Sequence, residues 1–201
     1  MVEANLRIIE ELKQFLELVS SNASLKKLFT QSESDFTRDR KLTMAKVVGL
    51  IINLPKRSLS IEIQEFFDSL SQGLNSSSKA AFCIQRSKLQ PFFFDIWNNW
   101  LVSCFYKYYG KKVKYWRGFR LLAIDGSTAY LISREDVVNY FGTQDNQHVK
   151  IPMARIMQVH DILNDITISG KIYPIKESEQ SIISKQVEDF YEDSTLALRL
   201  S

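Results

Sequence analysis

The sequence predicts an α+β protein, in which a helical first part is followed by the beginning of a part that contains a sheet. Apolar residues recur at helical spacing through roughly the first 120 residues. Beyond Gly118 they gather in short runs or alternate with polar residues, as they do in strands. We therefore expect a helical domain over residues 1–118 and an incomplete α/β domain over residues 119–201.

Local signals place the helices of the first part. A helical stripe covers residues 6–19 and stops at a polar Ser-Ser-Asn sequence. Thr43 is predicted to cap a helix over residues 47–54 that ends at Pro55, and Ser60 is predicted to cap the next helix. The remaining predicted helices cover residues 63–70, residues 80–89 and a long segment from Pro91 through Phe105.

The second part opens on two short apolar runs, at residues 121–124 and 129–132, which flank Asp125-Gly126-Ser127-Thr128. Asp-Gly is a common type I′ turn signal, so one interpretation is a hairpin. The continuous apolar run before Asp125 favours another, a strand buried on both faces with the carboxylate at its tip, placed to hold a divalent cation. Beyond it we expect a helix over residues 133–141, strands over 154–162 and 166–175 around a turn at 164–165, and a helix over 177–191.

Composition limits the setting of the protein. The chain has 201 residues and a net charge of +3, which says little about its partners. Its two cysteines, Cys83 and Cys104, form no CxxC motif and predict a reduced, cytosolic compartment. We expect no signal peptide and no membrane role, because the longest apolar run, residues 47–54, is far too short to span a bilayer.

A stretch over residues 105–120 interleaves cations with aromatic residues and contains no acidic residue. Its cations are Lys107, Lys111, Lys112, Lys114, Arg117 and Arg120. Cations release counterions from phosphates and aromatic rings stack on bases, so the stretch is a candidate for DNA contact. The alternative is that the aromatic rings pack on the helices and the lysines are only solvated. Smaller candidate groups are Arg38, Arg40 and Lys41, and Arg86 with Lys88.

Other titratable residues carry weaker signals. His148 and His160 have no Cys or His at zinc-ligand spacing, so we expect structural roles for them. Asp161 and Asp165 can approach Asp125 across a sheet, but turn and edge roles explain them at least as well.

Several motifs, in this order and spacing, resemble those of bacterial insertion-sequence transposases of the "insertion sequence four" family, which is of the DDE type. Three examples are DFTRDRKL at residues 35–42, QRSKL at 85–89 and LAIDGST at 122–128. Further matching segments lie at residues 47–54, 56–59, 66–67, 141–142, 152–155 and 160–165. The resemblance covers roughly residues 30–180.

This resemblance implies an RNase H-like catalytic domain, in which two Asp and one Glu hold two Mg²⁺ ions for attack on a phosphodiester. Only Asp125 matches, as the first metal-bridging carboxylate. The sequence ends about where the strand with the second Asp is expected, so we expect the catalytic domain to be incomplete. One carboxylate supplies too few oxygens for a Mg²⁺ pair, and we expect this chain alone not to cleave DNA.

Three functions remain open on the sequence. The first is a transposase fragment, related to enzymes that cut and join DNA in transposition. The second is a non-catalytic protein that binds the terminal repeats of the element, or pairs with itself or with intact transposase, and acts as a regulator or inhibitor. The third is a helical protein that does not bind DNA. The resemblance implies DNA as partner and the bacterial cytoplasm, near the nucleoid, as location.

Overall fold

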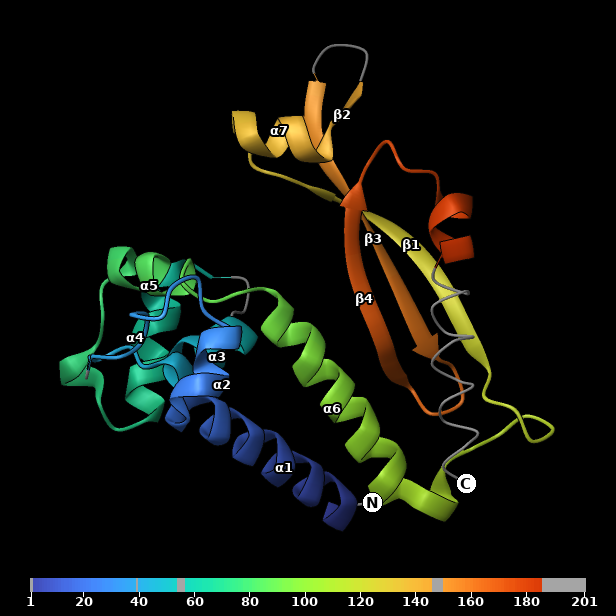
Figure 1. Cartoon of the computed structure of the whole chain (residues 1–201), viewed down its shortest axis with the longest axis horizontal. Coiled ribbons are helices and arrows are strands. Elements are labelled where there is room, and N and C mark those ends of the chain that lie inside the picture. Colours follow the sequence, from blue (N-terminus) through green and yellow to red (C-terminus); the bar gives the residue numbers. More distant parts are fainter. Residues whose placement is uncertain (1, 39, 54–56, 146–149, 186–201) are drawn as a thin grey trace. The chain divides into compact units, whose positions relative to one another are not determined.

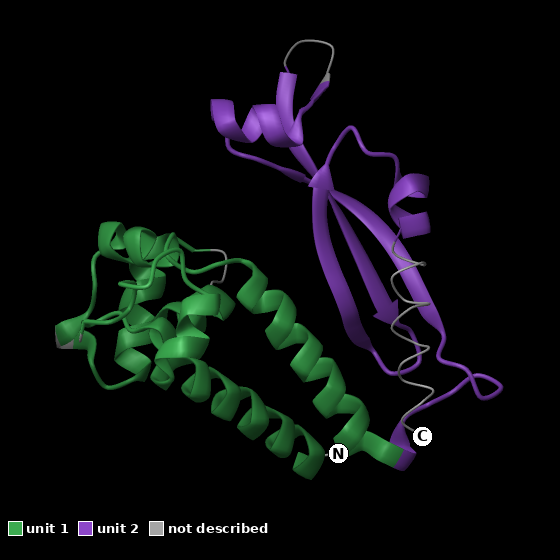
Figure 2. Ribbon diagram, viewed as in Figure 1, with its two compact units in different colours: residues 1–110 green, residues 111–201 purple. Residues whose placement is uncertain are grey.

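The computed structural model describes residues 2–38, 40–53, 57–145 and 150–185, and the protein is α+β. The chain divides into two compact units, residues 1–110 and residues 111–201 (Figures 1 and 2). The division falls at residue 110, eight residues before the boundary expected from the sequence. The basic and aromatic stretch over residues 105–120 is therefore shared between the two units.

The first unit is helical. Its helices are α1 (Val2–Ser21), α2 (Ala23–Leu28), α3 (Met44–Ile52), α4 (Leu59–Ser69), α5 (Lys79–Arg86) and α6 (Phe92–Tyr109). The long helices α1 and α6 pack side by side (Figure 1). The indole of Trp97 donates to the Leu12 carbonyl at 3.3 Å, and the rings of Phe15 and Trp100 stack 6.4 Å apart between these helices.

Two apolar clusters form the core of this unit. The first gathers Val19, Phe29, Met44, Val48, Leu89 and Phe93. The second gathers Leu42, Val47, Leu50, Ile63, Phe67 and Phe82. Because α3 contributes to both clusters, the short helices around it are fixed to the α1–α6 pair.

Most helix predictions for this unit are confirmed, with shifted ends. Thr43 caps α3 and accepts the N–H of Lys46 at 3.3 Å, as expected. The predicted cap at Ser60 is wrong, because the chain is still extended at Ser58 and α4 begins at Leu59. The first helix ends at Ser21, at the predicted polar sequence, and Asn22 then accepts the N–H of Leu25 as the cap of α2. The predicted stop at Pro55 lies outside the described residues.

The second unit is built on an antiparallel sheet. Its elements are β1 (Leu122–Tyr130), α7 (Glu135–Phe141), β2 (Thr143–Asp145), β3 (Lys150–Asp161) and β4 (Ile166–Pro174). Strand β3 is the longest and pairs with all three others. The predicted helix over 133–141 and the two later strands are confirmed, while β2 was not predicted. Residues 179–185 are helical, and the rest of the helix predicted to residue 191 lies outside the described residues.

The hairpin interpretation of Asp125-Gly126 is wrong. Strand β1 runs without a break through both residues, and Asp125 is the partner of Gln158 on β3. A Cβ at Gly126 would lie 3.0 Å from the Met157 sulfur and 3.2 Å from Glu179 Oε1. This glycine therefore permits close packing across the sheet rather than a turn.

The expectation that this strand is buried on both faces is also wrong. Residues 157, 159 and 161 of β3 are buried on the side of the sheet that Ile124 and Gly126 share. Residues 179–185 cover that side, where Ile182 is fully buried and Arg155 pairs with Glu179. Asp125 lies on the opposite side and is exposed, because neighbouring strand residues point to opposite faces.

Across the described ranges of both units, the structure contains no helix that is long and apolar enough to cross a bilayer.

Candidate nucleic-acid interface

Asp125 lies in the middle of β1, with the amide residue Gln158 opposite it on β3. Within the part of the chain that the structure describes, no three His, Cys, Asp or Glu residues are grouped so that they could hold a metal ion. Mg²⁺ requires near-octahedral oxygen coordination, and a pair of ions requires several carboxylates. The described residues around Asp125 therefore do not fit a two-ion site.

The neighbouring carboxylates have the turn roles that the sequence allowed. Asp161 is fully buried on the side of the sheet opposite Asp125, and it accepts hydrogen bonds from the Asn164 backbone and amide at 3.2 and 2.9 Å. Asp165 lies in the turn with a φ of 53°, and its carboxylate is 3.3 Å from His160 Nε2. His148 lies outside the described residues.

The first basic group is carried by the segment between α2 and α3. A short antiparallel bridge pairs Thr30 with Leu89 and ties the start of this segment to the α5–α6 connection. Around the bridge, Gln31 N–H donates to the Lys88 carbonyl and Gln90 N–H donates to the Phe29 carbonyl, each at 2.9 Å. These backbone bonds bring residues 34–38, Arg40 and Leu42 close to the end of α5.

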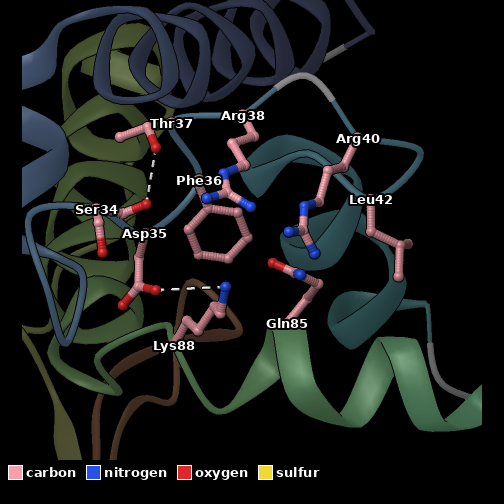
Figure 3. Close-up of a pocket in the computed structure, with 9 residues that line it drawn as sticks. All are labelled: Ser34, Asp35, Phe36, Thr37, Arg38, Arg40, Leu42, Gln85 and Lys88. Carbon is pink, nitrogen blue, oxygen red and sulfur yellow. Dashed lines mark hydrogen bonds and ion pairs between the residues drawn. The ribbon is translucent and has the colours of Figure 1, made fainter.

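At this place the structure has a cavity of about 290 Å³ (Figure 3). Three of the predicted DNA-binding cations, Arg38, Arg40 and Lys88, line it together, although they come from two separate segments. The cavity wall also contains Ser34, Asp35, Phe36, Thr37, Leu42 and Gln85. Lys41 and Arg86 are exposed but are not part of this wall, and the Arg86 guanidinium lies 5.7 Å from the centre of the Phe82 ring.

The polar side chains of the cavity differ in whether they have hydrogen-bond or ion-pair partners within the chain. Lys88 Nζ lies 3.4 Å from the Asp35 carboxylate, which also accepts the Ser32 N–H at 3.0 Å. Among the described residues, the side chains of Arg38, Arg40 and Gln85 have no hydrogen-bond or ion-pair partner. Gln85 is only 5% exposed, and Figure 3 shows its amide pointing into the cavity toward the Arg40 guanidinium. The rest of the Gln85 side chain is packed, so its amide is the part that can meet a ligand in the cavity.

Phe36 anchors the segment that carries the two arginines. Its backbone has a φ of 54°, an uncommon conformation for a residue with a large side chain. The ring packs against both core clusters of the unit, so the side chains that follow it are directed outward. Phe36, Thr37 and Arg38 also line a second cavity of about 660 Å³, on whose wall the buried Ser20 hydroxyl has no hydrogen-bond partner among the residues whose structure is described.

The stretch over residues 105–120 has two different environments. In its first part, on α6, the aromatic rings pack on the helices, as the alternative interpretation holds. The Tyr108 hydroxyl donates to Glu11 and the Tyr109 hydroxyl donates to Asn5 at 2.8 Å. Lys107 lies 3.4 Å from Glu11, so its charge is already compensated. The Tyr108 hydrogen bond, with a smaller effect of Lys107, lowers the pKa of Glu11.

In its second part the stretch is exposed. The backbone of Trp116 and Phe119 forms a small closed loop through two hydrogen bonds of 2.9 Å, and these side chains are 53% and 71% exposed. The Arg117 guanidinium lies 4.9 Å from the Trp116 ring centre. The exposed cations here are Lys111, Lys112, Lys114, Arg117 and Arg120. Exposed rings beside cations are the arrangement that stacks on bases, so this part of the stretch keeps its candidacy for DNA contact.

Sequence reasoning missed Gln85 and Asp35 as site residues. Gln85 lies in the QRSKL motif beside two candidate cations, but only the fold shows that its amide enters the same cavity as Arg40. Asp35 sits in the DFTRDRKL motif, where it orients Lys88.

Comparison with known proteins does not assign the chain. No protein family, curated protein or solved structure matches it.

Proposed function

We propose that this protein binds DNA through two basic groups, and that it belongs with the DDE transposases by descent. The observation that carries the proposal is the convergence of Arg38, Arg40 and Lys88 on one cavity, where the two arginines have no partner among the described residues. Three cations against one carboxylate among the described lining residues favour an anion, and phosphate binding releases condensed counterions. The exposed cations of segment 111–120 provide a second contact, beside exposed aromatic rings.

The transposase part of the proposal rests on the motif order in the sequence. It assigns β1 to the first strand of an RNase H-like catalytic domain and Asp125 to the first metal-binding carboxylate. The exposed position of Asp125 on β1 is compatible with this role. Mg²⁺, when bound in the intact family site, polarises the phosphate and activates the attacking oxygen.

Within this proposal the chain does not cut DNA by itself. Asp125 is the single carboxylate of the described residues on this part of β1, and one carboxylate cannot hold two ions. A second function is therefore favoured over cleavage: a regulator that occupies the terminal repeats of the element, or that pairs with intact transposase or with a second copy of itself.

DNA binding is tested by the salt dependence of affinity for duplex DNA. The double variant Arg38→Gln/Arg40→Gln should weaken binding. If each arginine contacts one phosphate, the slope of log K against log salt should become less negative by roughly 2. The triple variant Lys111→Gln/Lys112→Gln/Lys114→Gln tests the second group in the same way. Arg134→Gln is the matched control, because Arg134 is exposed and pairs only with its neighbour Asp136 in the described part of the chain. No measurable binding at low salt would reject the proposal.

Cleavage is tested separately with supercoiled DNA that carries the ends of the element. We expect no Mg²⁺-dependent nicking by the purified chain. Nicking that Asp125→Ala abolishes would show that the chain assembles a working metal site, and would reject the regulator in favour of the enzyme.

A further inference from the structure

We infer that the 290 Å³ cavity formed by residues 34–38, Arg40, Leu42 and the end of α5 is a specific pocket for one phosphate ester group, with the Gln85 amide as a hydrogen-bond donor (Figure 3). The inference deepens the proposed DNA binding, on which its preferred ligand, a phosphate of the DNA strand, depends. A free phosphate ester would satisfy the same chemistry, and the experiment below separates the two sources.

The charge of the wall fits an anion. Arg38, Arg40 and Lys88 contribute three positive charges and Asp35 one negative charge, which leaves a net charge of +2 on the described lining residues. The Asp35 carboxylate is directed to Lys88 and to the Ser32 N–H, and it therefore holds the ammonium in place. Guanidinium groups present paired N–H donors, a geometry that suits phosphate oxygens.

The position of Gln85 distinguishes this pocket from a solvated basic surface. A surface cluster of arginines keeps its hydrogen bonds with water and needs no buried group. Gln85 is instead 5% exposed, lies on the buried side of α5, and has no partner among the described residues. Its amide is directed into the cavity, so an oxygen of a ligand held there can accept its N–H in place of water.

The size of the cavity sets the class of ligand. Its volume corresponds to about ten water molecules at 30 Å³ each, and it lies near the lower end of the range for small-molecule sites. This is room for a phosphate with part of its sugar, and too little for a folded peptide or a duplex. A strand can therefore present one phosphate to the cavity while the rest of the DNA stays outside.

The decisive variant is Gln85→Leu, used in the full chain. Leucine has a similar volume and lacks the amide, so the variant should unfold near the wild-type temperature. It should bind DNA about tenfold more weakly, the loss expected for one hydrogen bond to a charged group. Arg40→Gln, at an exposed position, gives a second variant that does not depend on repacking of the core. Arg134→Gln is again the control.

Two measurements are made on each variant at constant ionic strength. The first is affinity for a short DNA duplex, and the second is the rise in unfolding temperature when inorganic phosphate replaces chloride. A ligand that binds only the folded chain raises this temperature. We expect both effects in the wild type and in Arg134→Gln, and a reduction of both in Gln85→Leu and Arg40→Gln.

The outcomes separate this inference from the proposed function. If the wild type binds DNA and both pocket variants bind it as well as Arg134→Gln does, the pocket is rejected and DNA binding stands on segment 111–120. If the wild type does not bind DNA but phosphate stabilises it through Gln85 and Arg40, the pocket stands with a free phosphate ester as ligand. If neither DNA nor phosphate has an effect that these variants reduce, the pocket is rejected.

Discussion

Asn164 holds the backbone of Lys114 on both sides: its amide donates to the Lys114 carbonyl at 3.0 Å and accepts the Lys114 N–H at 2.8 Å. The same amide donates to the buried carboxylate of Asp161 at 2.9 Å. One side chain of the β3–β4 turn therefore fixes the start of the second unit, fifty residues earlier in the sequence.

Replacing Asn164 with Ala should destabilise the second unit by about 2 kcal/mol, because three side-chain hydrogen bonds are lost and Asp161 loses a donor. Hydrogen exchange at the amide of Lys114 measures the local effect, and denaturant unfolding measures the global one. Asn99→Ala, at an exposed position of α6, is the control and should change neither. Unchanged protection of the Lys114 amide would contradict this role of Asn164.

The contact between α1 and α6 at Glu11 predicts a pH effect. The Tyr108 hydroxyl lowers the pKa of Glu11 below its ordinary value of 4.5, with Lys107 adding a smaller effect. A carboxylate whose pKa is lower in the folded chain stabilises it above pH 4.5, and this stabilisation is lost as the pH falls through the folded pKa.

Tyr108→Phe removes the hydrogen bond and should move the pKa of Glu11 upward, toward its ordinary value. An NMR titration of Glu11 from about pH 6 to about pH 3 would detect the shift, and unfolding over the same range should lose less stability than in the wild type. Tyr109→Phe, which removes only a bond to Asn5, leaves the Glu11 titration unchanged. An unaltered Glu11 pKa in Tyr108→Phe would refute the assignment.

We expect Trp116 to contribute to DNA binding but not to the stability of the fold. Its ring is 53% exposed, so Trp116→Ala should barely change the unfolding temperature. If a base stacks on this ring, affinity for single-stranded DNA should fall by roughly 1–3 kcal/mol, the usual value for one stacked base. Tyr140→Ala, at another exposed aromatic residue of the second unit, controls for general loss of apolar surface. Equal affinities of the two variants would remove Trp116 from the interface.

Close packing around Gly126 in β1 can be tested by adding a methyl group at this position. An added Cβ would lie 3.0 Å from the Met157 sulfur and 3.2 Å from the Glu179 carboxylate, so Gly126→Ala should cost about 1 kcal/mol of unfolding free energy. Gly170→Ala is a matched control in the same sheet, because the nearest atom to its Cβ would be 4.0 Å away. If both variants unfold at the same denaturant concentration, close packing at Gly126 is not what requires a glycine there.

The contrast between Thr43 and Gly126 shows which features the sequence predicts. Thr43 bonds to an N–H three residues later, so its capping role depends on local chain geometry alone and was predicted correctly. Asp125-Gly126 carries an equally local turn signal. The glycine is instead required by close packing against Met157 and Glu179, which are distant in sequence. A dipeptide pattern contains no information about such packing, and the hairpin prediction failed for that reason.

The same limit applies to the candidate interface: its charged residues were predictable from the sequence, but their arrangement in space was not. Arg38, Arg40 and Lys88 were identified by charge, but their meeting at one cavity depends on the bridge between Thr30 and Leu89. Gln85 has no charge and no pattern of its own, so only its burial beside Arg40 marks it. Lys107 shows the converse, since its charge is visible in the sequence while its compensation by Glu11 comes from the packing of α1 on α6.

The bridge between Thr30 and Leu89 affects how the sequence of this region can evolve. The loop that forms the cavity is attached through backbone atoms, and its ring anchor, Phe36, packs in the core. The outward side chains at Arg38 and Arg40 can therefore be exchanged without altering the path of the chain. Substitutions at these two positions, in nature or by laboratory selection, can therefore change ligand preference while the backbone stays fixed. Variable loops on a rigid scaffold work in the same way.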